Sequence, residues 1–86
     1  MMVDDSFRPT NLRGKLAWVV EECGELQAAI GKTQRFGINC ANPFLEPEEQ
    51  ETNREWILRE MRDLRKALTL LEDALTDYNA YPKRDD

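Results

Sequence analysis

The chain has 86 residues, of which 41% are hydrophobic and 34% charged, and its net charge is -5 at pH 7. This length favours one domain over residues 1–86, and the acidic balance without a basic face argues against binding of duplex nucleic acid. No apolar run approaches the roughly 18 residues of a membrane span, and the acidic N-terminus lacks the apolar core of a secretory signal. We therefore expect a cytoplasmic protein that does not enter a membrane, and the absence of histidine argues against a zinc site.

Residues 1–9 predict an N-terminal arm, and a first helix is expected over residues 10–31, with Thr10 or Asn11 as its cap. Apolar residues recur along this helix at alternating spacings of four and three, which indicates one continuous apolar face. This apolar seam consists of Leu12, Leu16, Val19, Cys23, Leu26 and Ile30.

Turn-forming residues without a sustained period occupy residues 32–52, which predicts a long connecting loop. Pro47, followed by two glutamates, favours a short helical turn within this loop. Loops of this length are uncommon unless they have a function of their own.

A second helix is expected over residues 53–79, because Thr52 and Glu55 form a capping-box pattern at its start. Residues 80–86 are expected to form a charged tail. The apolar seam continues on the second helix, at Ile57, Met61, Leu64, Leu68, Leu71, Leu75 and Tyr78.

Together these elements predict an all-α fold, a long antiparallel helical hairpin. Such a hairpin cannot bury both halves of the seam by itself, and chains this small usually need further help to be stable. We therefore expect a homodimer or homotetramer, in which hairpins form a four-helix bundle by homo-oligomerisation.

A 14-residue stretch occurs twice, as AWVVEECGELQAAI over residues 17–30 and as EWILREMRDLRKAL over residues 55–68. The matched pairs, at a constant offset of 38 positions, are Trp18 with Trp56, Glu22 with Glu60, Glu25 with Asp63 and Ala29 with Ala67. At about 100° per residue, each acidic pair falls on the same side of its seam. Both helices therefore carry a Trp–acid–acid–Ala row beside the apolar residues, and we call these rows the acidic stripes.

Carboxylates that lie half-buried among apolar side chains raise one another's pKa and destabilise the fold, and a divalent cation removes that conflict. Oxygen ligands without histidine or cysteine favour magnesium or manganese. Such ions can screen a polyphosphate, polarise its phosphorus and activate a water molecule. A lone Glu-x-x-Glu is usually a solvated helix edge, but its recurrence at the same angle on a second helix favours a metal site.

Five acidic residues form two short motifs along the chain, Glu21-Glu22-x-x-Glu25 and Glu60-x-x-Asp63. This order resembles the signature of the MazG-like, all-α nucleoside triphosphate pyrophosphohydrolases. The run EECGELQAAIGKTQRFG is similar to phage and mobile-element members, and the resemblance covers about residues 12 to 75. It implies magnesium-dependent cleavage of a nucleoside triphosphate between the α and β phosphates, giving a monophosphate and pyrophosphate.

By motif position, the resemblance implies four metal ligands: Glu22, Glu25, Glu60 and Asp63. It also implies a catalytic role for Glu22 together with Glu21, which either orients or deprotonates the attacking water or is simply solvated. Arg62 stands where many members have glycine, and we expect it either to crowd the site or to pair with an acid.

Candidate substrate-binding residues lie near the first acidic stripe and just past the first helix. Lys32 and Arg35 are placed to bind phosphates, unless they only stabilise the C-terminus of the helix. Trp18 and Phe36 offer rings that can stack on a base, with core packing as the alternative for each.

The first hypothesis from the sequence is therefore a magnesium-dependent nucleoside triphosphate pyrophosphohydrolase. Two alternatives stay open. One is a helical oligomerisation or interaction module whose acidic stripes contact a basic partner, and the other is an inactive relative that binds nucleotide or metal without turnover.

Overall fold

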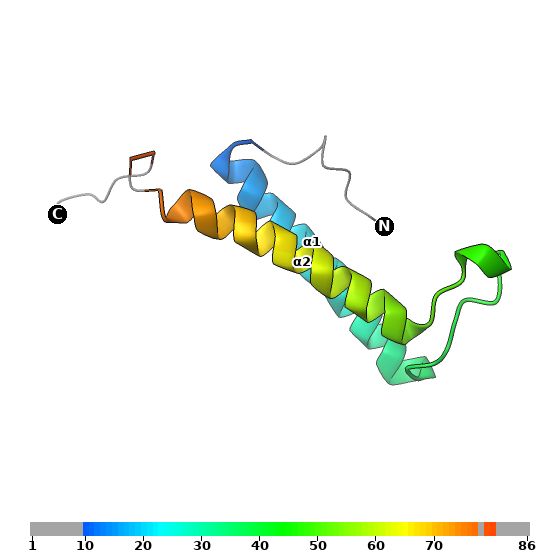
Figure 1. Ribbon diagram of the computed structural model, residues 1–86. Helices are drawn as coiled ribbons and strands as arrows, with labels where there is room; N and C mark the ends of the chain where they lie inside the picture. Colours follow the sequence, from blue (N-terminus) through cyan, green and yellow to red (C-terminus); the bar gives the residue numbers. More distant parts are fainter. Residues whose placement is uncertain (1–9, 78, 81–86) are drawn as a thin grey trace.

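The computed structural model describes residues 10–77 and 79–80. It contains two long helices, α1 (Leu12–Phe36) and α2 (Asn53–Leu75), and a short 3-10 helix, η2 (Pro47–Glu49). Figure 1 shows α1 and α2 side by side and running in opposite directions, with the loop that contains η2 joining them at one end. The predicted helical hairpin is confirmed, and so is the short turn at Pro47.

Three parts of the sequence prediction fall wholly or partly outside the described residues. They are the N-terminal arm, the last residue of the predicted seam, Tyr78, and the tail from residue 81 onward.

Side-chain caps fix where both long helices begin. Asn11 Oδ1 accepts a hydrogen bond of 2.7 Å from the backbone N–H of Gly14 and so caps α1. At the start of α2, Thr52 Oγ1 accepts a bond of 3.1 Å from the Glu55 N–H, and Glu55 Oε1 accepts one of 3.1 Å from the Thr52 N–H. This reciprocal pair is the predicted capping box.

Both helices end at positions other than those expected. The first continues through Gly31 to Phe36, because a glycine inside a helix costs only about 1 kcal/mol relative to alanine. The chain leaves this helix at Gly37, whose φ of 92° favours glycine. The second helix ends at Leu75 rather than at residue 79, and the Thr76 hydroxyl donates back to the Glu72 carbonyl at 2.9 Å.

The acidic stripes, and not the apolar seam, lie at the contact between α1 and α2. Ala29 and Ala67 are completely buried and Trp18 is 6% exposed, while Glu22 and Glu60 are 1% and 2% exposed. Small alanine side chains let two helix backbones come close together at this contact. The acidic stripes, which were predicted to lie beside an apolar seam, therefore form the contact between the helices themselves.

The seam instead lies beside the helix contact and is partly exposed. Leu16, Ile30, Leu68 and Leu75 are 46%, 41%, 46% and 51% exposed. Two helices can each cover only a narrow strip of the other, so the described residues leave this apolar face only partly covered.

The loop between the helices is tied to the start of α2 by backbone and side-chain bonds. The amide group of Asn53 donates to the Gly37 carbonyl at 2.8 Å, and the Asn53 N–H donates to the Cys40 carbonyl at 2.8 Å. Ala41 forms an isolated antiparallel bridge with Thr52. These bonds fix the end of the loop, and with it the neighbouring residue Glu51.

Candidate metal centre

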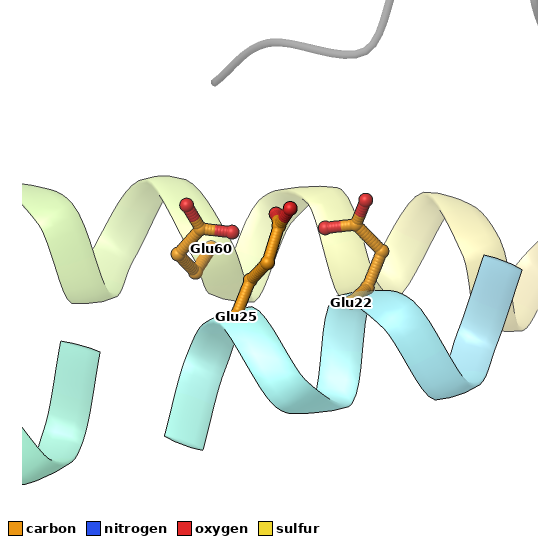
Figure 2. A group of neighbouring side chains, drawn as sticks. All are labelled: Glu22, Glu25 and Glu60. Atoms are coloured by element: carbon orange, nitrogen blue, oxygen red, sulfur yellow. The ribbon is translucent and has the colours of Figure 1, made fainter. Parts of the chain in front are cut away.

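Three carboxylates converge between the two long helices. Glu22 and Glu25 come from α1 and Glu60 comes from α2, and one oxygen of each lies within 4.8 Å of the others. Figure 2 shows the carboxyl groups of Glu22 and Glu25 directed away from the α1 backbone and lying side by side with that of Glu60. We call these residues the carboxylate cluster. The antiparallel packing of the two acidic stripes thus places three of the four predicted ligands together.

In each half of the sequence repeat, a tryptophan hydrogen-bonds the first acid of the acidic stripe. Trp18 Nε1 donates to Glu22 Oε1 at 3.0 Å, and Trp56 Nε1 donates to Glu60 Oε1 at 3.2 Å. The spacing of four residues is one helical turn, which is why both helices can form the same bond. In both copies of the repeat, the tryptophan indole therefore fixes the orientation of a buried carboxylate.

Two carboxylate oxygens of the stripes are buried without a hydrogen-bond partner in the described part of the chain: Glu22 Oε2 and Asp63 Oδ2. Buried polar atoms of this kind cost roughly 1–3 kcal/mol each, more when they carry charge. Most buried polar atoms in proteins are satisfied, so an exception indicates a function or a ligand.

Burial and mutual repulsion shift the protonation of these acids. Burial raises the pKa of Glu22, the Trp18 hydrogen bond lowers it, and the charges of Asp63 and Glu60 raise it further. Burial, a hydrogen bond with Glu60 and the charges of Glu22 and Glu60 raise the pKa of Glu25 to about 7. The cluster is therefore costly to ionise fully without a cation.

Asp63, the fourth predicted ligand, is buried on α2 at 3% exposure but is not among the carboxylates that lie within 4.8 Å of one another. It follows Glu60 by one helical turn. Burial and the charge of Glu60 raise its pKa, and its own charge acts on Glu22. Asp63 thus borders the cluster and contributes negative charge to it.

Sequence reasoning missed Arg59 and Glu51. Arg59 Nη1 donates to Glu60 Oε1 at 2.9 Å, while its Nη2 and Nε donate to Glu51 Oε1 at 2.6 Å and Glu51 Oε2 at 3.2 Å. Glu51 precedes α2, so no helical spacing in the sequence indicates this pair. Arg62, which was expected to crowd the site or to pair with an acid, has an exposed side chain that forms no ion pair or hydrogen bond within the described residues.

The remaining predicted residues are not members of the cluster, although Trp18 donates a hydrogen bond to one of its members, Glu22. Glu21 is exposed on α1. Lys32 and Arg35 lie at the end of α1, with Lys32 Nζ 5.9 Å and Arg35 Cζ 5.4 Å from the centre of the Phe36 ring. Lys32 follows Glu25 by seven residues, or roughly 10 Å of helix rise. Trp18 is almost fully buried, so packing and its bond to Glu22 account for its ring in this structure.

Trp56 lines two hollows on the surface. A pocket of about 520 Å³ is lined by the end of α1, the loop and the start of α2, including Lys32, Phe36 and Phe44. A smaller recess of about 300 Å³ is lined by Glu25, Ala28, Trp56, Arg59 and Glu60. The aromatic-lined pocket and the recess, which two cluster residues line, thus have one wall residue in common.

No family model, curated protein or solved structure matches this chain in sequence or fold comparisons. Among the described residues, no helix is long and apolar enough to cross a membrane. The chemistry of the site must therefore be argued from its own residues.

Proposed function

We propose that this protein is a magnesium-dependent nucleoside triphosphate pyrophosphohydrolase of the MazG-like kind. The observation that carries the proposal is the carboxylate cluster, three acids from two helices with oxygens within 4.8 Å of one another. The mutual repulsion of these carboxylates destabilises the fold unless protonation or a positive charge compensates it, and a bound divalent cation would supply that charge. The order of acids along the chain is the order in the family signature.

The donor atoms of the cluster fit a hard divalent cation. All are carboxylate oxygens, which favours magnesium or manganese, and the partnerless Glu22 Oε2 and Asp63 Oδ2 are free to bind one. Glu22, Glu25 and Glu60 would hold the ion, with Asp63 as the fourth ligand that the signature predicts. When bound, the ion supplies charge neutralisation, polarisation of a phosphoryl oxygen and a more acidic water.

The hollows beside the cluster suit a nucleotide. The recess next to Glu25 and Glu60 has room for phosphate groups, and the larger pocket offers Phe36 and Phe44 to a base. Lys32 lines the same pocket and supports the predicted contact with the substrate. Hydrolysis would add one water to the triphosphate, break the bond between the α and β phosphates, and release a monophosphate and pyrophosphate.

The protein is further proposed to act as a homodimer or homotetramer. The half-exposed seam residues on both helices, such as Leu16 and Leu68, form an apolar face that the single hairpin leaves uncovered. Packing this face against a second copy would remove it from water and complete a four-helix bundle.

A panel of ribo- and deoxyribonucleoside triphosphates, assayed with magnesium for pyrophosphate release, tests the proposal. At least one substrate should be cleaved, and Glu22→Gln and Glu60→Gln should abolish its cleavage. Glu72→Gln is the matched control, because Glu72 is an exposed glutamate of the same helix as Glu60. Glu21→Gln then decides whether that exposed acid takes part in water activation.

The two alternatives give different results in the same experiment. An inactive relative would release no pyrophosphate from any triphosphate, although magnesium would still raise its melting temperature. An interaction module would show no response to magnesium at all. The burial of the acidic stripes between the helices gives this last alternative less support, since a basic partner needs exposed acids.

A further inference from the structure

Arg59 is the cation that touches the carboxylate cluster in the described part of the chain. Its side chain is 20% exposed and contacts Glu60, whose side chain is 2% exposed, through a single bond of 2.9 Å from Nη1. Its other edge forms two bonds with Glu51, whose side chain is 33% exposed. A guanidinium has five N–H groups, so the bond to Glu60 uses only part of its donor capacity.

The two contacts of Arg59 differ in kind. Glu51 receives Nε and Nη2 on separate oxygens, which is the two-point geometry that holds an arginine most firmly. The Glu60 oxygen that receives Nη1 is also the acceptor of the Trp56 indole N–H at 3.2 Å. Arg59 is therefore anchored on Glu51, and its Nη1 end is the part that can change partner.

A divalent cation bound by Glu60 would change the electrostatic environment of Arg59 Nη1. Arg59 and the ion would then neutralise the same carboxylate, and their positive charges would repel each other. An anion placed between them removes the repulsion, because it is attracted by both. The recess that Arg59 lines with Glu25 and Glu60 offers such an anion a volume of about 300 Å³.

We propose that Arg59 binds a phosphate group of the metal-bound substrate, by turning its Nη1 N–H from Glu60 to a phosphate oxygen while Glu51 keeps the guanidinium in place. This inference rests on the proposed function. It assigns Arg59 to substrate binding and makes Glu51 a positioning residue. The neighbouring aromatic pocket has the lining residue Trp56 in common with the recess.

The cations predicted from the sequence are less suited to this role. Lys32 and Arg35 lie over the Phe36 ring at the end of α1. From there Lys32 can reach a ligand in the larger pocket, which it lines. Only Arg59, among the side chains that the structure describes, combines contact with a cluster carboxylate and a place in the recess.

Calorimetric titrations of the full chain test the assignment in two parts. Magnesium alone should bind more tightly to Arg59→Met than to the unchanged protein, because the competing cation is gone. A non-hydrolysable triphosphate analogue of the best substrate, with magnesium present, should bind Arg59→Met about ten- to a hundredfold more weakly, as expected for the loss of a charge-assisted hydrogen bond. Arg54→Met, which removes an exposed arginine of the same helix, should change neither.

Arg59→Lys and Glu51→Gln keep the test decisive if Arg59→Met does not fold. Lysine keeps the positive charge but lacks the two hydrogen-bonding edges of a guanidinium. The variant's affinity for the analogue should therefore be weaker, while its affinity for magnesium should not decrease. Glu51→Gln should weaken analogue binding in the same direction. Unchanged analogue affinity in the folded Arg59 variants, with an active unchanged protein, would overturn this inference and leave the proposed function standing. An unchanged protein that neither binds magnesium nor releases pyrophosphate would overturn both.

Discussion

Glu22→Gln should make the metal-free protein more stable and remove its stabilisation by magnesium. Glu22 is 1% exposed, and its nearest carboxylates in the cluster lie within 4.8 Å. At that separation, two full charges in surroundings with an effective dielectric constant of about 20 repel by about 3 kcal/mol. Glutamine keeps an oxygen that can accept the Trp18 hydrogen bond but carries no charge.

The gain in free energy of unfolding should be smaller than the full repulsion, because the raised pKa values of Glu22 and Glu25 mean that protonation already removes part of the repulsion. We expect Glu22→Gln to raise the free energy of unfolding by about 1–3 kcal/mol at pH 8. In a domain of 60–100 residues, each kcal/mol raises the melting temperature by roughly 4–8 °C. Magnesium should stabilise the unchanged protein by mass action and have little effect on the variant. The order of stability should therefore reverse when the ion is added.

The assay is thermal unfolding followed by circular dichroism, at one chain concentration, with a chelator or with saturating magnesium. Glu21→Gln is the matched control, since it removes the same charge from an exposed neighbouring position, and its melting temperature should respond to magnesium like that of the unchanged protein. The reasoning would be refuted if Glu22→Gln melted at a lower temperature than the unchanged protein in chelator. It would also be refuted if magnesium raised the melting temperature of the variant as much as that of the unchanged protein.

Three further predictions concern pH, assembly and the end of α1. The pKa of Glu25 is raised to about 7, so the folded metal-free protein binds more protons than the unfolded chain, and up to about 3 kcal/mol of stability should be lost from about pH 5 to pH 8. Denaturant titrations in chelator should show this fall, and Glu25→Gln should flatten it. Leu68→Lys should lower the molecular mass found by sedimentation, because it charges the exposed seam, and an unchanged mass would contradict the proposed bundle. Gly37→Ala should lower the free energy of unfolding by about 1–2 kcal/mol, since an added Cβ meets no atom within 4 Å there and the cost comes from the φ of 92° alone. The control Gly24→Ala, inside α1 and equally unobstructed, should instead raise it by roughly 0.5–1 kcal/mol.

The sequence predicted the helices well because their signals are local. The Asn11 cap and the Thr52–Glu55 capping box depend only on residues within one turn, and both are present. The first helix was expected to end at residue 31, and it continues because the glycine at that position tolerates a helix interior as well as a helix end. The conformation of the backbone at Gly37, which ends the helix, cannot be deduced from composition.

The choice of packing face could not be predicted from one chain. Helical angles place the acidic stripe beside the seam but do not say which of two adjacent rows meets the other helix. The usual association of apolar residues with the core pointed to the seam, yet Glu22 and Glu60 are buried while Leu16 is 46% exposed. The contact between Glu51 and Arg59 was equally hidden, since it depends on the path of the loop.

The repeat also explains why the candidate site is asymmetric. At the offset of 38, Arg59 occupies the position of Glu21, so the residue just before the first acid of the stripe is an acid in one copy and a cation in the other. The Trp–Glu bond is the same in both copies, but Glu21 is exposed, whereas Arg59 binds Glu60 and Glu51. A symmetric pair of acidic stripes would repel a polyphosphate from every side unless cations covered it completely. Under the proposed function, Arg59 on α2 would give a polyphosphate a positively charged approach, while the carboxylates of the cluster would hold the metal ion.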